Sequence, residues 1–265
     1  EIKYNEREKE LRLAKESTPT QGHQHYHCGN KACAGDHTDT QTTFAAPISG
    51  ADALQGSAYY KTLSTGTYYL TGDLALGEHT LRIEGDVTLC LNGYSITSKS
   101  GYAVYLDSAS KLTLSDCKRG GTAEYGKITG TTGGVGVFNG SSFTMYGGEI
   151  TGNRQNGGVH VEATGVESSY KATFTMYGGK IAGNGAAKGG GVYVGDNCAF
   201  TMSGGVISNN IADENGGGVF VDAREAGEVG GDIAEFTVSG SAKITSNTVD
   251  GTPNNVYLPA NKTIT

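Results

Sequence analysis

Apolar and polar residues alternate in short runs along most of this chain, and the same runs return in a fixed order. Residues 143–153 read Phe-Thr-Met-Tyr-Gly-Gly-Glu-Ile-Thr-Gly-Asn, residues 174–184 and 200–210 repeat this order, and residues 236–247 follow it more loosely. Val-x-Val runs preceded by glycines separate the copies. Alternation at a period of two predicts strands, and short strands that return with glycine turns are typical of a solenoid.

Each copy predicts three strands, which together make one coil: Phe-Thr-Met, the Ile after Gly-Gly, and Val-x-Val. Because side chains alternate between the faces of a strand, Phe and Met share the inner face and Thr lies outside. Stacked coils then align equivalent residues in ladders that form the core. The predicted inner ladders are Phe143, Phe174, Phe200 and Phe236; Ile128, Ile150, Ile181, Ile207 and Ile244; and Val159, Val192 and Val219. The predicted outer threonines are Thr113, Thr144, Thr175, Thr201 and Thr237.

An asparagine closes each copy, three residues after the Ile. These residues are Asn153, Asn184, Asn210 and Asn247. An inward asparagine at a turn bonds to its counterpart in the next coil and to turn backbone. We therefore predict a structural asparagine ladder rather than a catalytic set.

The chain divides into three parts by pattern. Residues 1–20 are rich in charged side chains at helical spacing and predict a short helix, either a linker or a lid over the open end of the solenoid. Residues 21–43 form a polar segment rich in His and Cys. Residues 44–265 predict the β-helix, with irregular first coils to about residue 98 and regular coils over 99–258.

Composition excludes two classes of partner. The chain has 265 residues, 43 of them Gly, and a net charge of −7. No basic patch for nucleic acid is present, and no apolar run reaches the roughly 18 residues of a membrane span.

The sequence begins at Glu1 without Met and stops in strand-like residues, so we expect a monomeric piece of a larger multidomain chain.

The repeats resemble those of a known group. Residues 143–153, the run Gly-Gly-Gly-Val-Tyr-Val at 189–194 and Asn-Val-Tyr-Leu-Pro at 255–259 resemble β-helix repeats of secreted or cell-wall-attached proteins of Gram-positive anaerobic bacteria. His27-Cys28-Gly29 and residues 89–93 resemble the segment that opens such repeats. The resemblance implies an all-β, right-handed parallel β-helix with three sheets, of the pectin-lyase-like fold, at the bacterial cell surface. Signatures of polygalacturonases and calcium-dependent pectate lyases are absent from the sequence.

A first candidate site lies in the His- and Cys-rich segment. Four of the six His and two of the five Cys fall within it: His23, His25, His27, His37, Cys28 and Cys33. Imidazole and thiolate are zinc ligands, and a closed structural site takes four of them. The alternatives are a disulfide between Cys28 and Cys33 or a His-rich linker without either.

A second candidate site is the middle residue of each Val-x-Val strand. If the valines face inward, these residues line up on the outer face about 4.8 Å apart. They are Tyr105, Gly136, His160, Tyr193, Phe220 and Tyr257. A line of rings on a rigid sheet suits stacking on sugars or gripping a protein; alternatively, neighbouring rings simply stabilise the sheet.

A third candidate site lies at two long insertions, residues 162–173 and 222–235, on either side of the short turn at 195–199. Insertions in solenoids map to one face, which is often the binding face. The carboxylates considered for acid–base catalysis are Glu162, Asp196, Asp222 and Glu228. Such carboxylates could hold Ca²⁺, run glycoside hydrolysis, or only keep acidic loops soluble.

These observations favour a non-catalytic extracellular module that binds a glycan or a host or cell-surface protein, or that acts as a presenting stalk. The alternative is a carbohydrate-active enzyme, a glycoside hydrolase or polysaccharide lyase, with its cleft between the two insertions. Fold alone does not decide between them.

Overall fold

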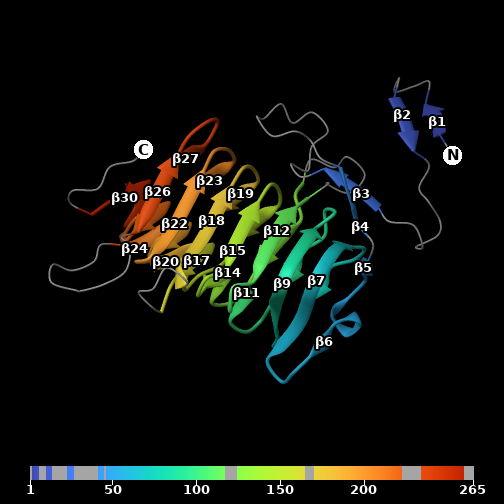
Figure 1. The fold of residues 1–265 in the computed structure, drawn as a ribbon. Coiled ribbons are helices and arrows are strands. Elements are labelled where there is room, and N and C mark those ends of the chain that lie inside the picture. Colours follow the sequence, from blue (N-terminus) through green and yellow to red (C-terminus); the bar gives the residue numbers. More distant parts are fainter. Residues whose placement is uncertain are drawn as a thin grey trace.

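The computed structural model describes residues 2–5, 10–13, 23–26, 41–44, 46–116, 124–164, 170–222 and 234–259. From residue 46 onward these residues form a parallel β-helix, in which each coil adds one strand to each sheet. The coils follow one another along a single axis from β5 (Ala46–Ile48) to β30 (Val256–Tyr257) (Figure 1). The predicted all-β fold with parallel sheets is confirmed.

The Ile strands form one seven-stranded parallel sheet. Its members are β8 (Leu74–Ala75), β10 (Ile96–Thr97), β13 (Lys127–Thr129), β16 (Glu149–Thr151), β19 (Lys180–Ala182), β23 (Val206–Ser208) and β27 (Lys243–Thr245). Ile96, Ile128, Ile150, Ile181, Ile207 and Ile244 lie in register across it. The sheet therefore places one apolar side chain of each coil at the equivalent position of the core.

The other two predicted sheets are joined into one sheet of 15 strands. One arm contains the Phe-Thr-Met strands β12 (Lys111–Ser115), β15 (Ser142–Met145), β18 (Ala172–Met176), β22 (Cys198–Met202) and β26 (Glu235–Val238). The second arm contains β11 (Tyr102–Leu106), β14 (Gly133–Phe138), β17 (Val159–Glu162), β21 (Val192–Val194), β25 (Val219–Val221) and β30. The remaining members are β5, β6 (Gln55–Gly56), β7 (Tyr60–Leu70) and β9 (Thr80–Cys90).

The two arms are continuous because β9 runs round a corner of the coil. Its residues 81–83 pair with β11 and its residues 86–90 pair with β12. Gly85 lies between them with φ 77°, a conformation that glycine adopts without steric cost. The irregular early coils therefore differ from the later ones, in which separate strands and a turn replace this single long strand.

A fourth strand, which the sequence analysis did not predict, appears in the last coils. It forms a four-stranded sheet of β20 (Gly185–Lys188), β24 (Ile211–Asn215), β28 (Thr248–Val249) and β29 (Thr252–Pro253). These short segments follow the ladder asparagines and carry no apolar alternation. β20, β24 and β28 pair in parallel through the stacking of coils, whereas β28 and β29 form an antiparallel hairpin within the last coil.

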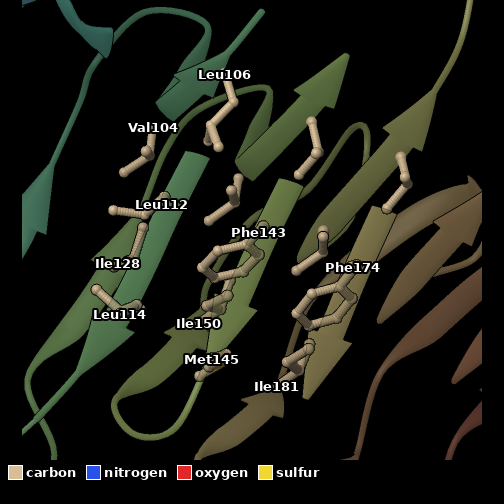
Figure 2. Close-up of a cluster of buried hydrophobic side chains, with 14 of the residues drawn as sticks. Val104, Leu106, Leu112, Leu114, Ile128, Phe143, Met145, Ile150, Phe174 and Ile181 are labelled. Atoms are coloured by element: carbon tan, nitrogen blue, oxygen red, sulfur yellow. The ribbon is translucent and has the colours of Figure 1, made fainter. Parts of the chain in front are cut away.

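The core consists of the predicted ladders (Figure 2). Phe143, Phe174, Phe200 and Phe236 stack with ring centroids 4.7–5.1 Å apart. Every valine of the Val-x-Val strands in β17, β21 and β25 is at most 1% exposed. Each such buried side chain contributes roughly 1.5–3 kcal/mol of transfer free energy, and a single coil cannot bury them without its neighbours.

The asparagine ladder is confirmed, and it is longer than predicted. The amide nitrogen of each side chain donates to the amide oxygen of the next, at 2.7–3.0 Å from Asn153 through Asn184, Asn210 and Asn247 to Asn255. The first four side chains are fully buried. Buried amides are costly unless they are bonded, and here each bonds to its neighbour.

The glycine before each Val-x-Val strand makes room for this ladder. A Cβ at Gly158 would lie 2.6 Å from Ile181 Cγ2 and 2.9 Å from Asn184 Nδ2. A Cβ at Gly191 would meet Ile207 and Asn210 in the same way. These glycines are therefore required by close approach in the core.

The predicted N-terminal helix is wrong for the residues that are described. β1 (Ile2–Asn5) and β2 (Glu10–Leu13) are strands that pair antiparallel. Their register sets Ile2 opposite Leu13 and Tyr4 opposite Leu11. Apolar residues therefore recur at the strand period of two. The prediction failed because it gave more weight to the charged residues at helical spacing. β3 (His23–Tyr26) and β4 (Gln41–Phe44) form a second antiparallel pair. Within the described ranges, no helix is long and apolar enough to cross a membrane.

Candidate functional site

The middle residues of the Val-x-Val strands lie in register, as predicted. Cross-strand pairs join Tyr105 to Gly136, Gly136 to His160, His160 to Tyr193, Tyr193 to Phe220 and Phe220 to Tyr257. We call this set, together with Phe138, the aromatic row. The residues that flank the row in β11, β14, β17, β21 and β25 are buried, so the row lies on the outer face of the second arm of the large sheet.

Phe138 supplies the ring that Gly136 lacks. A Cβ at Gly136 would lie 2.6 Å from Cε2 of Phe138, so the Phe138 ring covers this glycine. Its centroid is 5.2 Å from that of Tyr105 and 6.0 Å from that of His160. The aromatic row therefore continues through the one coil in which the sequence pattern showed a gap.

From His160 to Tyr257 the rings of the row cover one another's faces, whereas Phe138 is tilted by 31° and 35° to its neighbours Tyr105 and His160. His160 and Tyr193 are 4.5 Å apart with an angle of 6° between their planes, and the Tyr193–Phe220 and Phe220–Tyr257 pairs are also nearly parallel. Phe220 is only 4% exposed, and the Lys188 ammonium lies 5.3 Å from its ring centroid. Since ring faces meet ring faces, the row presents its edges outward.

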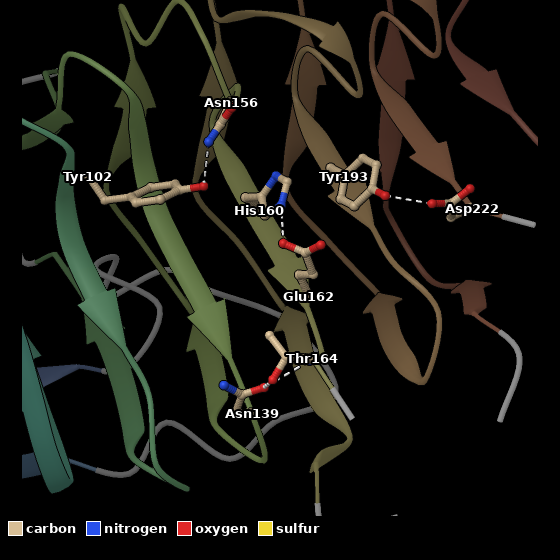
Figure 3. A network of polar contacts seen from close by, with 8 residues as sticks. All are labelled: Tyr102, Asn139, Asn156, His160, Glu162, Thr164, Tyr193 and Asp222. Atoms are coloured by element: carbon tan, nitrogen blue, oxygen red, sulfur yellow. Dashed lines mark hydrogen bonds and ion pairs between the residues drawn. The ribbon is translucent and has the colours of Figure 1, made fainter. Parts of the chain in front are cut away.

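Polar side chains lie beside these rings at several coils (Figure 3). Asn156 Nδ2 donates to Tyr102 Oη at 2.7 Å. His160 Nε2 and Glu162 Oε2 lie 3.1 Å apart, and Tyr193 Oη donates to Asp222 Oδ2 at 2.5 Å. We call these six residues the polar row: Tyr102, Asn156, His160, Glu162, Tyr193 and Asp222.

The bond between His160 and Glu162 determines the tautomer of the imidazole. The hydrogen bond from His160 holds the pKa of Glu162 below its ordinary value, although burial opposes this. An ionised carboxylate only accepts, so Nε2 of His160 carries the hydrogen. Glu162 consequently stays charged at and below neutral pH.

The two tyrosines of the polar row resist ionisation. Burial raises the pKa of Tyr102 to about 12, against the opposing bond from Asn156. Burial also raises the pKa of Tyr193 well above its ordinary value, and Asp222, Glu162 and Asp196 raise it further. Both hydroxyls are therefore neutral hydrogen-bonding groups under physiological conditions.

Three of the four carboxylates proposed for catalysis affect the same tyrosine. Glu162, Asp196 and Asp222 all act on the hydroxyl of Tyr193 through their charge. Glu228 lies outside the described residues, as do residues 165–169 of the first insertion and 223–233 of the second. Among the described residues, no group of three or more His, Cys, Asp or Glu side chains is placed to hold a metal ion. Calcium in the acidic loops remains a prediction.

The zinc prediction also remains untested. His23 and His25 belong to β3, whereas His27, Cys28, Cys33 and His37 lie outside the described residues. The disulfide alternative at Cys28 and Cys33 therefore stays open.

The cysteines of the β-helix that are described are core residues. Cys90 and Cys198 are fully buried, and burial raises the pKa of the Cys198 thiol to about 12. Cys117, the third cysteine of this region, lies outside the described residues. A buried thiol with a raised pKa behaves as a small hydrophobic side chain.

Three residues that matter for the site, Phe138, Tyr102 and Asn156, were missed from the sequence. Phe138 directly follows Val137, one position beyond the expected row, and only the neighbouring Gly136 signalled a space for it. Tyr102 and Asn156 are 54 residues apart, and no local pattern connects them.

The comparisons with protein-family models, with curated proteins and with solved structures returned no match.

Proposed function

We propose that this chain is a non-catalytic extracellular module of a larger bacterial surface protein and that it binds a glycan of the host or cell surface through the polar row. The observation that carries the proposal is a set of three polar pairs spread over the second arm from β11 to β25, beside a stack of rings. Preorganised side chains lose little conformational freedom on binding, which is the property a recognition surface needs.

The chemistry of the polar row suits sugar hydroxyls. Carboxylates, tyrosine hydroxyls and an amide together offer both acceptors and donors, and hydrogen bonds to charged acceptors are the stronger ones. The ring edges add apolar contact between the polar groups. Binding would therefore use hydrogen bonds at the edges of the rings, rather than the stacking on flat ring faces expected from the sequence.

The enzyme alternative receives less support from the same residues. A general acid for glycoside hydrolysis needs a raised pKa, whereas the pKa of Glu162 is lowered. Asp222 is engaged by the Tyr193 hydroxyl. Glu162 could then serve only as the ionised member of a catalytic pair, and the general acid would have to be another carboxylate, such as Asp196 or Glu228.

The test is a glycan microarray probed with the chain and with the Tyr193→Phe and Glu162→Gln variants. Both substitutions keep the side-chain size and remove one polar function each. Tyr177→Phe is the matched control, because Tyr177 stacks on Tyr146 and follows the last residue of β18, on the other arm of the sheet.

We expect binding that both row variants weaken and the control retains. The absence of binding to any glycan would contradict the proposal and would favour a protein partner or a stalk. Release of shortened sugars from a bound glycan would instead favour the enzyme.

A further inference from the structure

We propose that the ligand of the polar row is a linear, uncharged, extended glycan chain that lies parallel to the axis of the β-helix, with one sugar unit for each coil. This inference rests on the proposed function and adds the shape, charge and orientation of the ligand. It follows from the spacing, the extent and the chemistry of the row.

The spacing of the row is that of the sheet. The aromatic row, from Tyr105 to Tyr257, runs without a register shift, so it repeats about every 4.8 Å, and two members of the polar row, His160 and Tyr193, lie in this register. A sugar unit in an extended chain has a comparable length. Such a chain can meet polar groups of several coils at once, whereas a terminal sugar or a branched cap meets only one.

The partly exposed stretch of the polar and aromatic rows ends before Phe220 in β25. Tyr102, Phe138, His160 and Tyr193 are partly exposed, and they stand on or beside four consecutive strands, β11, β14, β17 and β21. At the next strand, Phe220 is buried, with the Lys188 ammonium over its ring. The four strands from β11 to β21 span about 15 Å, so the stretch of the polar row between Tyr102 and the covered Phe220 accommodates about four sugar units.

The donors and acceptors of the row favour a neutral chain. The hydroxyl of Tyr193 donates its hydrogen bond to Asp222, so it can only accept from a ligand. The hydroxyl of Tyr102 accepts from Asn156, so it can donate to a ligand. A sugar hydroxyl both donates and accepts, so it can satisfy either group. The carboxylates of a polyuronate would instead face Glu162 and Asp222, and like charges repel.

The test is titration calorimetry with linear oligosaccharides of one to six units. The neutral probes are β-linked oligomers of glucose, N-acetylglucosamine, mannose and xylose, and the anionic probes are oligogalacturonates of matched length. For at least one neutral series we expect affinity to rise with each added unit and to level off at about four units. Oligogalacturonates should bind more weakly at every length.

The Glu162→Gln variant provides the internal comparison. Glu162 lies on the third of the four open strands, so its loss should weaken binding of the four-unit oligomer about tenfold. Glu78→Gln, an exposed carboxylate in the turn before β9, is the matched control and should change nothing. A four-unit oligomer that loses no affinity in Glu162→Gln would overturn the inference.

The remaining outcomes separate this inference from the proposed function. Affinity that does not rise with length in any neutral series, or tighter binding of oligogalacturonates, would overturn the linear neutral chain. If other glycans still bind on the array, the proposed function stands. If no glycan binds in either experiment, both fail.

Discussion

At the scale of the residue, Asn184 illustrates how one side chain connects three coils. Its Oδ1 accepts from the backbone N and from Nδ2 of Asn153, at 3.2 and 2.7 Å. Its Nδ2 donates to the backbone oxygen of Ile150 at 2.9 Å and to Asn210 Oδ1 at 3.0 Å. All four bonds are made by a fully buried amide, so the side chain has no solvent to replace a lost partner.

We predict that Asn184→Leu lowers the free energy of unfolding by about 3–5 kcal/mol, because Asn153 and Ile150 are left with buried polar groups that have lost a partner. Urea denaturation followed by circular dichroism measures this loss. Thr201→Leu, on the outer face of a nearby coil, should change the same quantity by less than about 0.5 kcal/mol. A similar effect of the two substitutions would refute a special role for the ladder.

Some residues of the site could be predicted from the sequence, whereas their hydrogen bonds could not. The aromatic row, apart from Phe138, was predictable because its members stand between two apolar residues, Val and Val or Val and Leu, a pattern visible in the sequence. The bonds of Tyr193 to Asp222 and of Tyr102 to Asn156 were not, because both depend on where the chain returns after one or more coils. The polar row is thus a product of coil stacking.

At the scale of the element, a strand in the middle of the sheet differs from one at its end. Phe174 in β18 is stacked on both sides, 5.0 Å from Phe143 and 4.7 Å from Phe200. Phe236 in β26 has one described ring neighbour, Phe200 at 5.1 Å, and is 6% exposed rather than 1%. Truncation of the side chain would therefore leave an enclosed cavity at Phe174 and a more open one at Phe236.

We predict that Phe174→Ala costs about 3–5 kcal/mol of stability, because a cavity between two rings cannot collapse. Phe236→Ala should cost clearly less, since its surroundings can relax at the end of the stack. The comparison uses the urea midpoints of the two variants, with the slope of the transition as a check on two-state behaviour. Equal losses would show that the stack is not organised coil by coil.

At the scale of the whole molecule, the β-helix is an array in which each coil contacts only its neighbours. Stability in such an array is close to a sum over coils and over the interfaces between them. Inner coils are covered on both sides, whereas no further described strand pairs with β26, β27 or β30 of the last described coil. Local opening should therefore become easier toward that end.

We predict that hydrogen exchange of backbone amides is slowest in β15, β18 and β22 and faster in β26 and β27. Native-state exchange followed by mass spectrometry gives the protection of each strand. Uniform protection from β12 to β27 would indicate that the molecule opens as a single unit, contrary to this expectation.

The sequence by itself determined the elements that recur: the Phe, Ile and Val ladders, the asparagine ladder and the register of the aromatic row. Each depends on the local alternation of side chains and on a repeat, and stacking then follows from the need to bury apolar surface. The N-terminal strands escaped prediction because charges at helical spacing masked an apolar alternation.

Only the tertiary structure decided the rest. It joined two predicted sheets through β9, added the strands β20 and β24, turned Phe138 over Gly136 and brought Asp222 to Tyr193. The physical reason is common to all four: these contacts connect residues of different coils or fill a space left by another residue. Local propensity carries no information about such contacts, because they exist only once the coils are stacked.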